Sequence, residues 1–170
     1  ISSFSTVGNY DYGIFWYLYL DGTIELEIKL TGIVGISAHN EEIHNPEQDM
    51  KITEELVSPI HQHLFNVRID WFLDGGQNKL IETNAERVPI GNKNPHGTQF
   101  QAISNHLKKE SEAKRNIAPE KSRVWKITNP NKKNSIGGES AYKFLPGYSP
   151  VLLSDFDSPT GKRASFAKYN

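Results

Sequence analysis

Two histidines separated by one residue, His61 and His63, are the residues of this 170-residue chain whose types and spacing most directly suggest chemistry. On a β-strand, residues i and i+2 project from the same face, so both imidazoles could reach one ion. Neutral imidazole is a good ligand for copper and zinc. Two ligands do not make a metal site, so a third histidine or a carboxylate would have to come from elsewhere. The alternative interpretation is an ordinary pair of strand histidines.

The sequence around this pair predicts the strand that would carry it. From His61 to Leu73, odd positions hold the two histidines and then large apolar residues, whereas polar residues recur at even positions. Alternation with period two is typical of a strand with one buried face. The histidines would lie on that face, where a buried imidazole needs a polar partner, and this favours a metal site. Asp74-Gly75-Gly76 is expected to end the strand in a turn.

The composition excludes several other kinds of site. The chain has no cysteine, which excludes disulfides, thiolate metal sites and cysteine nucleophiles. Its 19 basic and 20 acidic residues give a net charge of −1, which argues against a nucleic-acid partner. No apolar run approaches the roughly 20 residues that a membrane-spanning helix needs, so no membrane partner is expected. The remaining histidines lie in polar sequence and are expected to be solvated: His39, His44, His96 and His106.

The rest of the chain predicts strands far more often than helices. An aromatic run at 12–20, the turn pair Asp21-Gly22 and an alternating run at 23–31 predict a β-hairpin. Residues 32–50 are expected to form a surface excursion, and 105–116 a short surface turn of helix. Weaker strands are predicted at 79–86, 100–103, 123–128 and 141–145, and loops at 129–131, 137–138 and 158–159. The predicted fold class is therefore an all-β sandwich.

A second candidate feature is Tyr10, which lies between Asn9 and Asp11 at the entrance to the first aromatic strand. Gly8-Asn9 predicts a bend or bulge before that strand. Taken alone, this segment is adequately explained as a turn followed by an aromatic strand. Its position about fifty residues before the histidine pair, however, is part of a longer pattern.

The order of these motifs resembles that of the copper amine oxidases. The pattern T-x-x-N-Y-D-Y is followed by D-G-x-I-x-x-x-x-x-L-T-G-I and then by H-Q-H. In that family the tyrosine of T-x-x-N-Y-[DE] is oxidised in place to topaquinone by bound copper and dioxygen. The resemblance runs through the whole chain, and further matching segments lie at 107–115 (LKKESEAKR), 125–129 (WKITN), 138–145 and 162–166 (KRASF).

The resemblance implies a role for each residue of the two motifs. Tyr10 would be the topaquinone precursor and Asn9 the neighbour that restrains the orientation of the quinone ring. His61 and His63 would be two of three copper(II) ligands. The implied reaction is the oxidative deamination of primary amines to aldehydes, with dioxygen as the oxidant and with release of ammonia and hydrogen peroxide.

Five further positions match the family pattern. Asp11 would hydrogen-bond a ligand histidine, a role in which a carboxylate commonly supports imidazole. Tyr12 and Leu30 would line a small apolar pocket for dioxygen. Asp70 and the Trp71 carbonyl would form half of a peripheral calcium- or manganese-type site. At this site the sequence departs from the family, because Phe72 stands where relatives carry a further acid two residues after the first.

The family's catalytic base and third copper histidine have no counterpart among these residues. We therefore expect residues 1–170 to be part of a single catalytic β-sandwich domain, lacking upstream and downstream portions, that is inactive alone and exposes edge strands prone to association. The complete protein is expected to be a homodimer. Two other readings remain open at this point: a non-catalytic β-sandwich module that binds a metal or a partner, and a zinc hydrolase, for which no carboxylate is fixed near H-Q-H.

Overall fold

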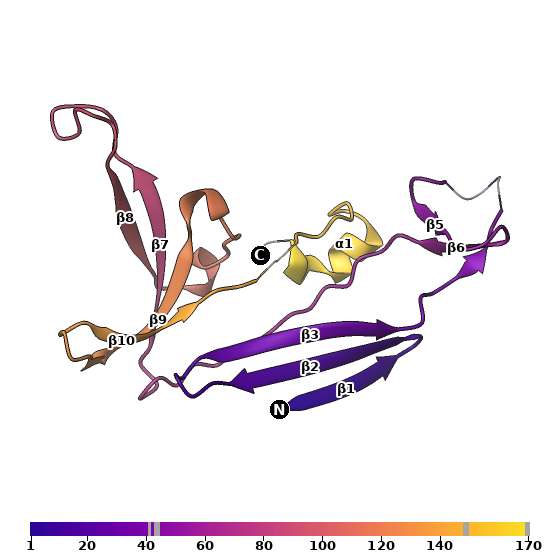
Figure 1. The fold of residues 1–170 in the computed structure, drawn as a ribbon, viewed down its shortest axis with the longest axis horizontal. Helices are drawn as coiled ribbons and strands as arrows, with labels where there is room; N and C mark the ends of the chain where they lie inside the picture. The colour runs from indigo at the N-terminus through magenta and orange to yellow at the C-terminus, as the bar shows by residue number, and fades with distance from the viewer. Residues whose placement is uncertain (41, 43–44, 148–149, 169–170) are drawn as a thin grey trace. The chain divides into compact units, whose positions relative to one another are not determined.

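The computed structural model describes residues 1–40, 42, 45–147 and 150–168, and these residues fall into two compact units (Figure 1). The first unit is Ile1–His61 and the second is Gln62–Asn170. Strands dominate both, as the all-β prediction requires. None of the helices among the described residues is long and apolar enough to cross a membrane.

A three-stranded antiparallel sheet dominates the first unit. It contains β1 (Ser2–Val7), β2 (Tyr10–Leu18) and β3 (Ile24–Gly32), in the order β1-β2-β3. The predicted hairpin is confirmed, because β2 and β3 pair from Tyr10↔Gly32 to Leu18↔Ile24 across the Asp21-Gly22 turn. The aromatic and alternating runs thus form the strands that their propensities indicated.

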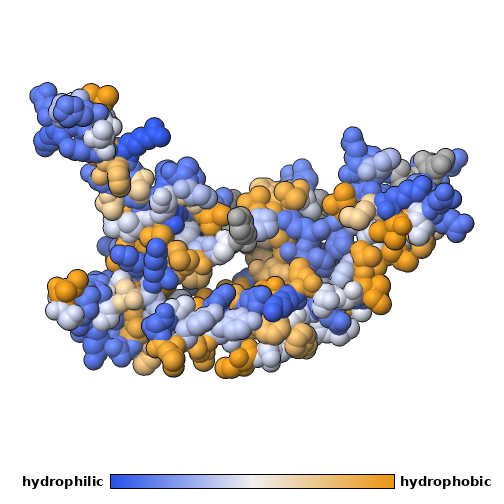
Figure 2. All heavy atoms as spheres, viewed as in Figure 1, coloured by the Kyte–Doolittle hydropathy of each residue, from blue (hydrophilic) through white to orange (hydrophobic). Residues whose placement is uncertain are grey.

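The two faces of this sheet differ sharply. One face carries Tyr10, Tyr12 and Trp16 of β2 opposite Gly32, Leu30 and Leu26 of β3. The other face combines the Phe15 ring with the charged residues of β3, and there the Tyr17 and Tyr19 hydroxyls donate hydrogen bonds of 2.7 Å to Glu27 and Glu25. Apolar residues reach the surface along the sheet (Figure 2). Tyr10 therefore lies at the end of the apolar face.

A second, smaller sheet completes the first unit. It pairs β4 (Ser37–Ala38) and β5 (Asp49–Lys51) with the central strand β6 (Leu56–Pro59), all antiparallel. The expected surface excursion at 32–50 thus contains one short strand and the start of another. Because β6 ends at Pro59, two residues before His61, this sheet determines where His61 lies in the first unit.

The second unit is built on a four-stranded antiparallel sheet in the order β10-β9-β7-β8. Its strands are β7 (Lys79–Arg87), β8 (Phe100–Leu107), β9 (Val124–Lys133) and β10 (Glu139–Phe144), with 3₁₀ turns at Glu110–Glu112 and Pro119–Lys121. A five-residue helix, α1 (Pro159–Arg163), and a 3₁₀ turn at Ser165–Ala167 follow. Buried apolar residues of this unit include Leu107, Trp125, Ile127, Leu152 and Ala167.

Three local predictions need correction. The segment 129–131, predicted as a loop, lies inside β9, and a register shift between Glu139 and Ser140 of β10 accommodates it. Of the helix expected at 105–116, only the 3₁₀ turn Glu110–Glu112 forms, because 105–107 belong to β8. The strand predicted from His61 to Leu73 is wrong: residues 60–72 are assigned no strand.

That last correction has a physical reason. Alternation reports which side chains share a face, but a strand also requires a neighbouring strand that accepts its ladder hydrogen bonds. The apolar residues of this run remain accessible, with Phe65, Val67 and Ile69 each about two-fifths exposed at 42%, 44% and 39%. The histidine pair therefore lies on an irregular segment rather than on the face of a sheet.

Candidate functional site

Tyr10 is held at the first position of β2 by a close backbone approach. The turn between β1 and β2 passes through Gly8 (φ 63°), and Tyr10 pairs with Gly32 at the end of β3. Gly32 has φ 108°, and a Cβ there would lie 2.5 Å from the Asn9 carbonyl oxygen. That same carbonyl accepts a 2.7 Å hydrogen bond from the Ile33 amide. Only glycine fits at position 32, so the backbone on both sides of Tyr10 is fixed.

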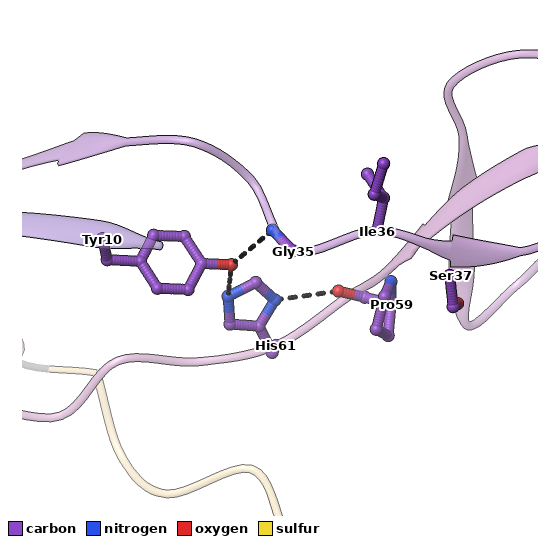
Figure 3. Close-up of a pocket in the computed structure, with 6 residues that line it drawn as sticks. All are labelled: Tyr10, Gly35, Ile36, Ser37, Pro59 and His61. Atoms are coloured by element: carbon purple, nitrogen blue, oxygen red, sulfur yellow. Dashed lines mark hydrogen bonds between the residues drawn. The ribbon is translucent and has the colours of Figure 1, made fainter. Parts of the chain in front are cut away.

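The Tyr10 hydroxyl connects three segments of the first unit (Figure 3). Its oxygen lies 3.0 Å from Nε2 of His61 and accepts a 3.1 Å hydrogen bond from the Gly35 amide. The two rings lie with their centroids 5.6 Å apart. A small open pocket at this point is lined by Tyr10, Gly35, Ile36, Ser37, Pro59 and His61. The structure thus brings Tyr10 and His61, singled out separately in the sequence, into direct contact.

The tautomer of His61 follows from its other ring nitrogen. Nδ1 lies 2.8 Å from the Pro59 carbonyl oxygen, which can only accept a hydrogen bond. In the neutral imidazole, Nδ1 therefore carries the proton and Nε2 presents its lone pair. The Tyr10 hydroxyl donates to that lone pair while it accepts from Gly35. This tautomer is the one that an imidazole needs to bind a metal through Nε2.

The groups at His61 are of the kinds that bind copper, but the described residues do not supply a full set of metal ligands there. An imidazole nitrogen that presents a lone pair and an adjacent phenol oxygen are groups that bind copper well. His61 is the last residue of the first unit, and the half-buried His63 belongs to the second. Among the described residues no group of three or more His, Cys, Asp or Glu side chains could hold an ion. A joint role for the two histidines remains a prediction.

Other residues of the Tyr10 motif lie close by. Tyr12 and Leu30 face each other across β2 and β3, on the same face as Tyr10, as a shared pocket would require. Asn9 is exposed in the turn before Tyr10. The Asp11 carboxylate accepts a 2.5 Å hydrogen bond from the Thr6 hydroxyl across the β1–β2 pair. Its bond to a ligand histidine remains a prediction.

The remaining predicted site residues lie apart from this cluster in the sequence. Asp70 is exposed on the irregular segment, and the half-buried Trp71 ring packs 6.1 Å from that of Tyr142. His96 and His106 are exposed, as expected, but His39 is half-buried beside a second pocket. His44 lies outside the described residues.

Two contacting residues, Gly35 and Pro59, were not predicted from the sequence. Both act through backbone atoms, the Gly35 amide and the Pro59 carbonyl, so no side-chain pattern could reveal them. The only signal was position: Pro59 precedes His61 by two residues, and proline is common where a strand ends.

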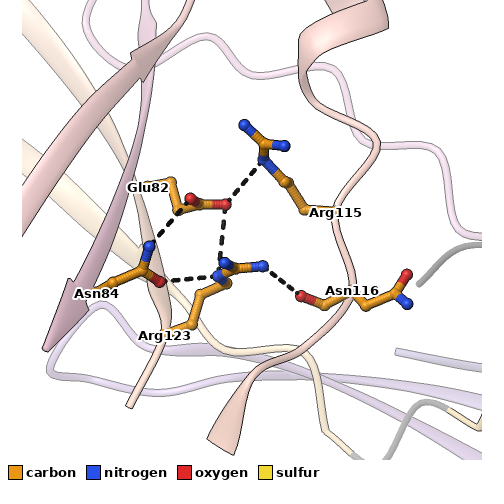
Figure 4. A network of polar contacts seen from close by, with 5 residues as sticks. All are labelled: Glu82, Asn84, Arg115, Asn116 and Arg123. Atoms are coloured by element: carbon orange, nitrogen blue, oxygen red, sulfur yellow. Dashed lines mark hydrogen bonds and ion pairs between the residues drawn. The ribbon is translucent and has the colours of Figure 1, made fainter. Parts of the chain in front are cut away.

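A different polar cluster occupies the second unit (Figure 4). The Glu82 side chain is only 2% exposed and receives Nε of Arg115 at 3.2 Å and Nε of Arg123 at 3.5 Å. Asn84 donates to Glu82 at 3.3 Å and accepts from Arg123 at 2.8 Å. Arg123 also donates to the Asn116 carbonyl at 2.9 Å. The charges of this cluster are paired with one another, which indicates a structural role.

Comparison with known proteins identifies the family to which the sequence belongs. The family model described as "Copper amine oxidase, enzyme domain" matches residues 1–170, the whole chain. The chain belongs to the copper amine oxidases. Its motifs therefore lie in a family whose members carry out amine oxidation.

Individual members of the family show how far the similarity extends. The chain is 43% identical to a histamine oxidase from Arthrobacter globiformis over 174 residues, covering 100% of this chain and 25% of that protein. It is 39% identical to a primary amine oxidase from Arthrobacter sp. (strain P1), covering 100% and 26%. The chain thus spans about a quarter of the length of these curated relatives.

Solved structures confirm the predicted fold class. A copper-containing benzylamine oxidase from Hansenula polymorpha matches with a TM-score of 0.85 at 28% identity, over 99% of this chain and 26% of that one. The lysyl oxidase from Pichia pastoris matches with a TM-score of 0.76 at 26% identity, over 91% and 21%. The all-β sandwich class of the copper amine oxidases is therefore the fold class of this chain, which covers a part of it.

Proposed function

We propose that the protein carrying this chain is a copper- and topaquinone-dependent primary amine oxidase, and that Tyr10 is the residue converted to topaquinone. The observation that carries the proposal is the contact of 3.0 Å between the Tyr10 hydroxyl and Nε2 of His61. This contact joins the first tyrosine of the T-x-x-N-Y-D-Y motif to the first histidine of H-Q-H. Residues 1–170 would form part of one catalytic domain.

In this proposal His61 and His63 would hold copper(II), and Tyr10, which contacts His61, would be the residue oxidised. When bound, the metal and dioxygen supply the oxidation of the tyrosine ring to the quinone that takes electrons from primary amines. The Pro59 carbonyl keeps the proton of His61 on Nδ1, so that Nε2 remains a donor atom. The Gly35 amide holds the Tyr10 oxygen from the opposite side and limits rotation of the ring.

The surrounding residues take supporting roles in the same proposal. Asn9, in the turn before β2, would restrain the quinone ring, and Asp11 would support a ligand histidine. Tyr12 and Leu30, paired across β2 and β3, offer an apolar surface for dioxygen on the face that carries Tyr10. Asp70 and the Trp71 carbonyl would contribute to a peripheral calcium- or manganese-type site, and the complete protein would be a homodimer.

The test compares the complete protein with its Tyr10→Phe variant, in which copper can bind but no quinone can form. Metal-free protein is loaded with Cu(II) in air, and hydrogen peroxide release is measured with simple primary amines. We expect release from the wild type and from Tyr17→Phe, the matched control on the opposite face of the same strand, but not from Tyr10→Phe. Peroxide release from Tyr10→Phe equal to that of the wild type would refute the role of Tyr10. Copper binding without amine turnover in any form would instead support a non-catalytic metal-binding module.

A further inference from the structure

Gln62, the middle residue of the histidine triplet, makes two hydrogen bonds to a distant part of the second unit. Its side-chain Nε2 donates to the Val151 carbonyl at 2.9 Å, and its Oε1 accepts from the Leu153 amide at 3.1 Å. Donor and acceptor of one amide group thus bond the two residues on either side of Leu152. This is how a neighbouring strand would pair with 151–153, and the two bonds together fix the amide orientation.

The segment that Gln62 contacts is itself firmly held. Leu152 is 5% exposed, and its amide donates to the Ala167 carbonyl at 3.0 Å. Helix α1 follows, capped by the Ser158 hydroxyl, which accepts from the Gly161 amide at 2.9 Å. A Cβ at Gly161 would lie 2.2 Å from the Asp155 carbonyl oxygen, so the helix is packed tightly onto the preceding turn. Gln62 is thus anchored to a compact element rather than to a loose chain.

The histidine triplet on the other side of this contact is held by side-chain contacts rather than by a strand ladder, and His61 contacts Tyr10 and the Pro59 carbonyl. Residues 60–72 are assigned no strand, so backbone ladder bonds do not hold the histidine triplet in place. A ligand that must keep its position without strand pairing depends on side-chain contacts of its neighbours. Gln62 is covalently next to His63 and is half-buried.

We infer that Gln62 is a positioning residue, which pins the Gln62-His63 part of the chain to Val151–Leu153 and thereby fixes His63 for metal binding. The inference rests on the proposed function for the identity of the metal, but the pinning itself does not. A metal site with a preorganised ligand binds its ion more tightly, because less conformational entropy is lost on binding. Supporting groups around metal ligands typically change metal affinity by about 10–100-fold.

The experiment uses the complete protein and two variants of Gln62. Gln62→Met keeps the size of the side chain and removes both hydrogen bonds, whereas Gln62→Glu keeps the acceptor for Leu153 but turns a carboxylate toward the Val151 carbonyl. Gln101→Ala, at an exposed position on β8, is the control. Hydrogen exchange at the Leu153 amide is measured in metal-free protein, and the copper dissociation constant is measured by competition with a chelator.

In Gln62→Met we expect exchange at Leu153 to accelerate at least tenfold and copper to bind about 10–100-fold more weakly. Gln62→Glu is expected to keep more of the Leu153 protection and still to weaken copper binding, and Gln101→Ala to match the wild type. Unchanged exchange at Leu153 in Gln62→Met would refute the pinning, and faster exchange with unchanged copper affinity would refute its role in the metal site. A wild-type protein that protects Leu153 but binds no copper would refute the proposed function instead, and with it the metal role of Gln62.

Discussion

The polar groups around Tyr10 and those around Glu82 are assembled in opposite ways. Tyr10 and His61 are accessible, and their partners are main-chain atoms of Gly35 and Pro59. Glu82 is buried, and its partners are the side chains of two arginines and an asparagine. The backbone contacts of the first cluster orient Tyr10 and His61. The Nε2 lone pair of His61 then accepts a hydrogen bond from the Tyr10 hydroxyl, whose proton is exchangeable. The side-chain contacts of the second neutralise a buried charge.

This difference indicates what each cluster does. A buried carboxylate must be fully paired, and removing either partner leaves an uncompensated charge in the protein interior. An accessible imidazole held in one tautomer needs no such compensation. Its Nε2 atom can bind a metal ion in place of the hydrogen bond from the Tyr10 hydroxyl. We therefore expect substitutions at Tyr10 and His61 to change chemistry without changing stability, and substitutions at Glu82 to do the reverse.

The largest expected effect is on chemistry, at His61. In the complete protein, His61→Ala should reduce the rate of quinone formation after copper loading by at least about a thousandfold, beyond the 10–100-fold typical of groups that only support a ligand. The rate is followed through the phenylhydrazine adduct. His106→Ala, at an exposed position on β8, should react like the wild type. Normal quinone formation in His61→Ala would show that the His61 imidazole is not needed for the chemistry at Tyr10.

Next in size is the effect of Glu82→Ala on stability. It leaves Arg123 and Arg115 without their carboxylate, and we expect the free energy of local opening of β7 and β9 to fall by about 3 kcal/mol. Hydrogen exchange of the amides between these strands measures it. Glu86→Ala, exposed on the same strand, should change it by less than about 0.5 kcal/mol. Equal effects of the two substitutions would show that the cluster is not structural.

A smaller effect is expected where backbone orients the site. Gly35→Pro removes the amide that donates to Tyr10 and should slow quinone formation about tenfold, with copper affinity unchanged. Gly35→Ala is the control, because it keeps the amide and its Cβ would lie 3.5 Å from the Tyr10 oxygen, an ordinary contact. If alanine slows the reaction as much as proline, then space rather than the hydrogen bond matters at this position.

The smallest effect concerns Glu139, a half-buried carboxylate that differs from Glu82 in having one hydroxyl and one lysine as partners. The Thr128 hydroxyl at 2.7 Å, and after it Lys79 at 3.2 Å, hold the pKa of Glu139 below its ordinary value. Stabilisation from a lowered pKa is present above the unfolded-state pKa and is lost as the pH falls through the folded-state pKa. Thr128→Val should therefore raise the pKa of Glu139, so that this stabilisation becomes smaller and its loss is complete at a higher pH.

An NMR titration of the Glu139 carboxyl measures that shift. Thr83→Val serves as the control, because the Thr83 hydroxyl bonds Ser104 instead. A pKa that stays low in Thr128→Val would assign the effect to Lys79.

The sequence predicted those parts of the fold that depend on local patterns. The aromatic run, the Asp21-Gly22 turn and the alternating run form the β2–β3 hairpin because strand propensity and turn geometry act within a few residues. The strand from His61 to Leu73 failed because pairing depends on a distant partner. The segment at Asn129 was misjudged for a similar reason: its side chain donates to the carbonyls of Leu73 and Asp74, which are far away in the sequence.

The candidate site shows the same limit. Tyr10 and His61 could be identified from residue types and motif order, and the structure brings them together. Gly35 and Pro59 could not be identified in this way, because they contribute main-chain atoms. The partners of Gln62 could not be identified either, because they lie some ninety residues further along the chain. Side-chain patterns reveal which groups can do chemistry, whereas the contacts that hold them depend on the tertiary fold.

The most direct test of the account is the mass of the Tyr10 peptide before and after copper loading. The complete protein is prepared without metal, incubated with Cu(II) in air, digested and analysed by mass spectrometry. We predict that the peptide containing Tyr10 changes to the mass of the quinone form, while the peptide containing Tyr142 does not change. A protein that has bound copper and still carries an unmodified Tyr10 would contradict the central claim that the Tyr10–His61 contact is the catalytic centre.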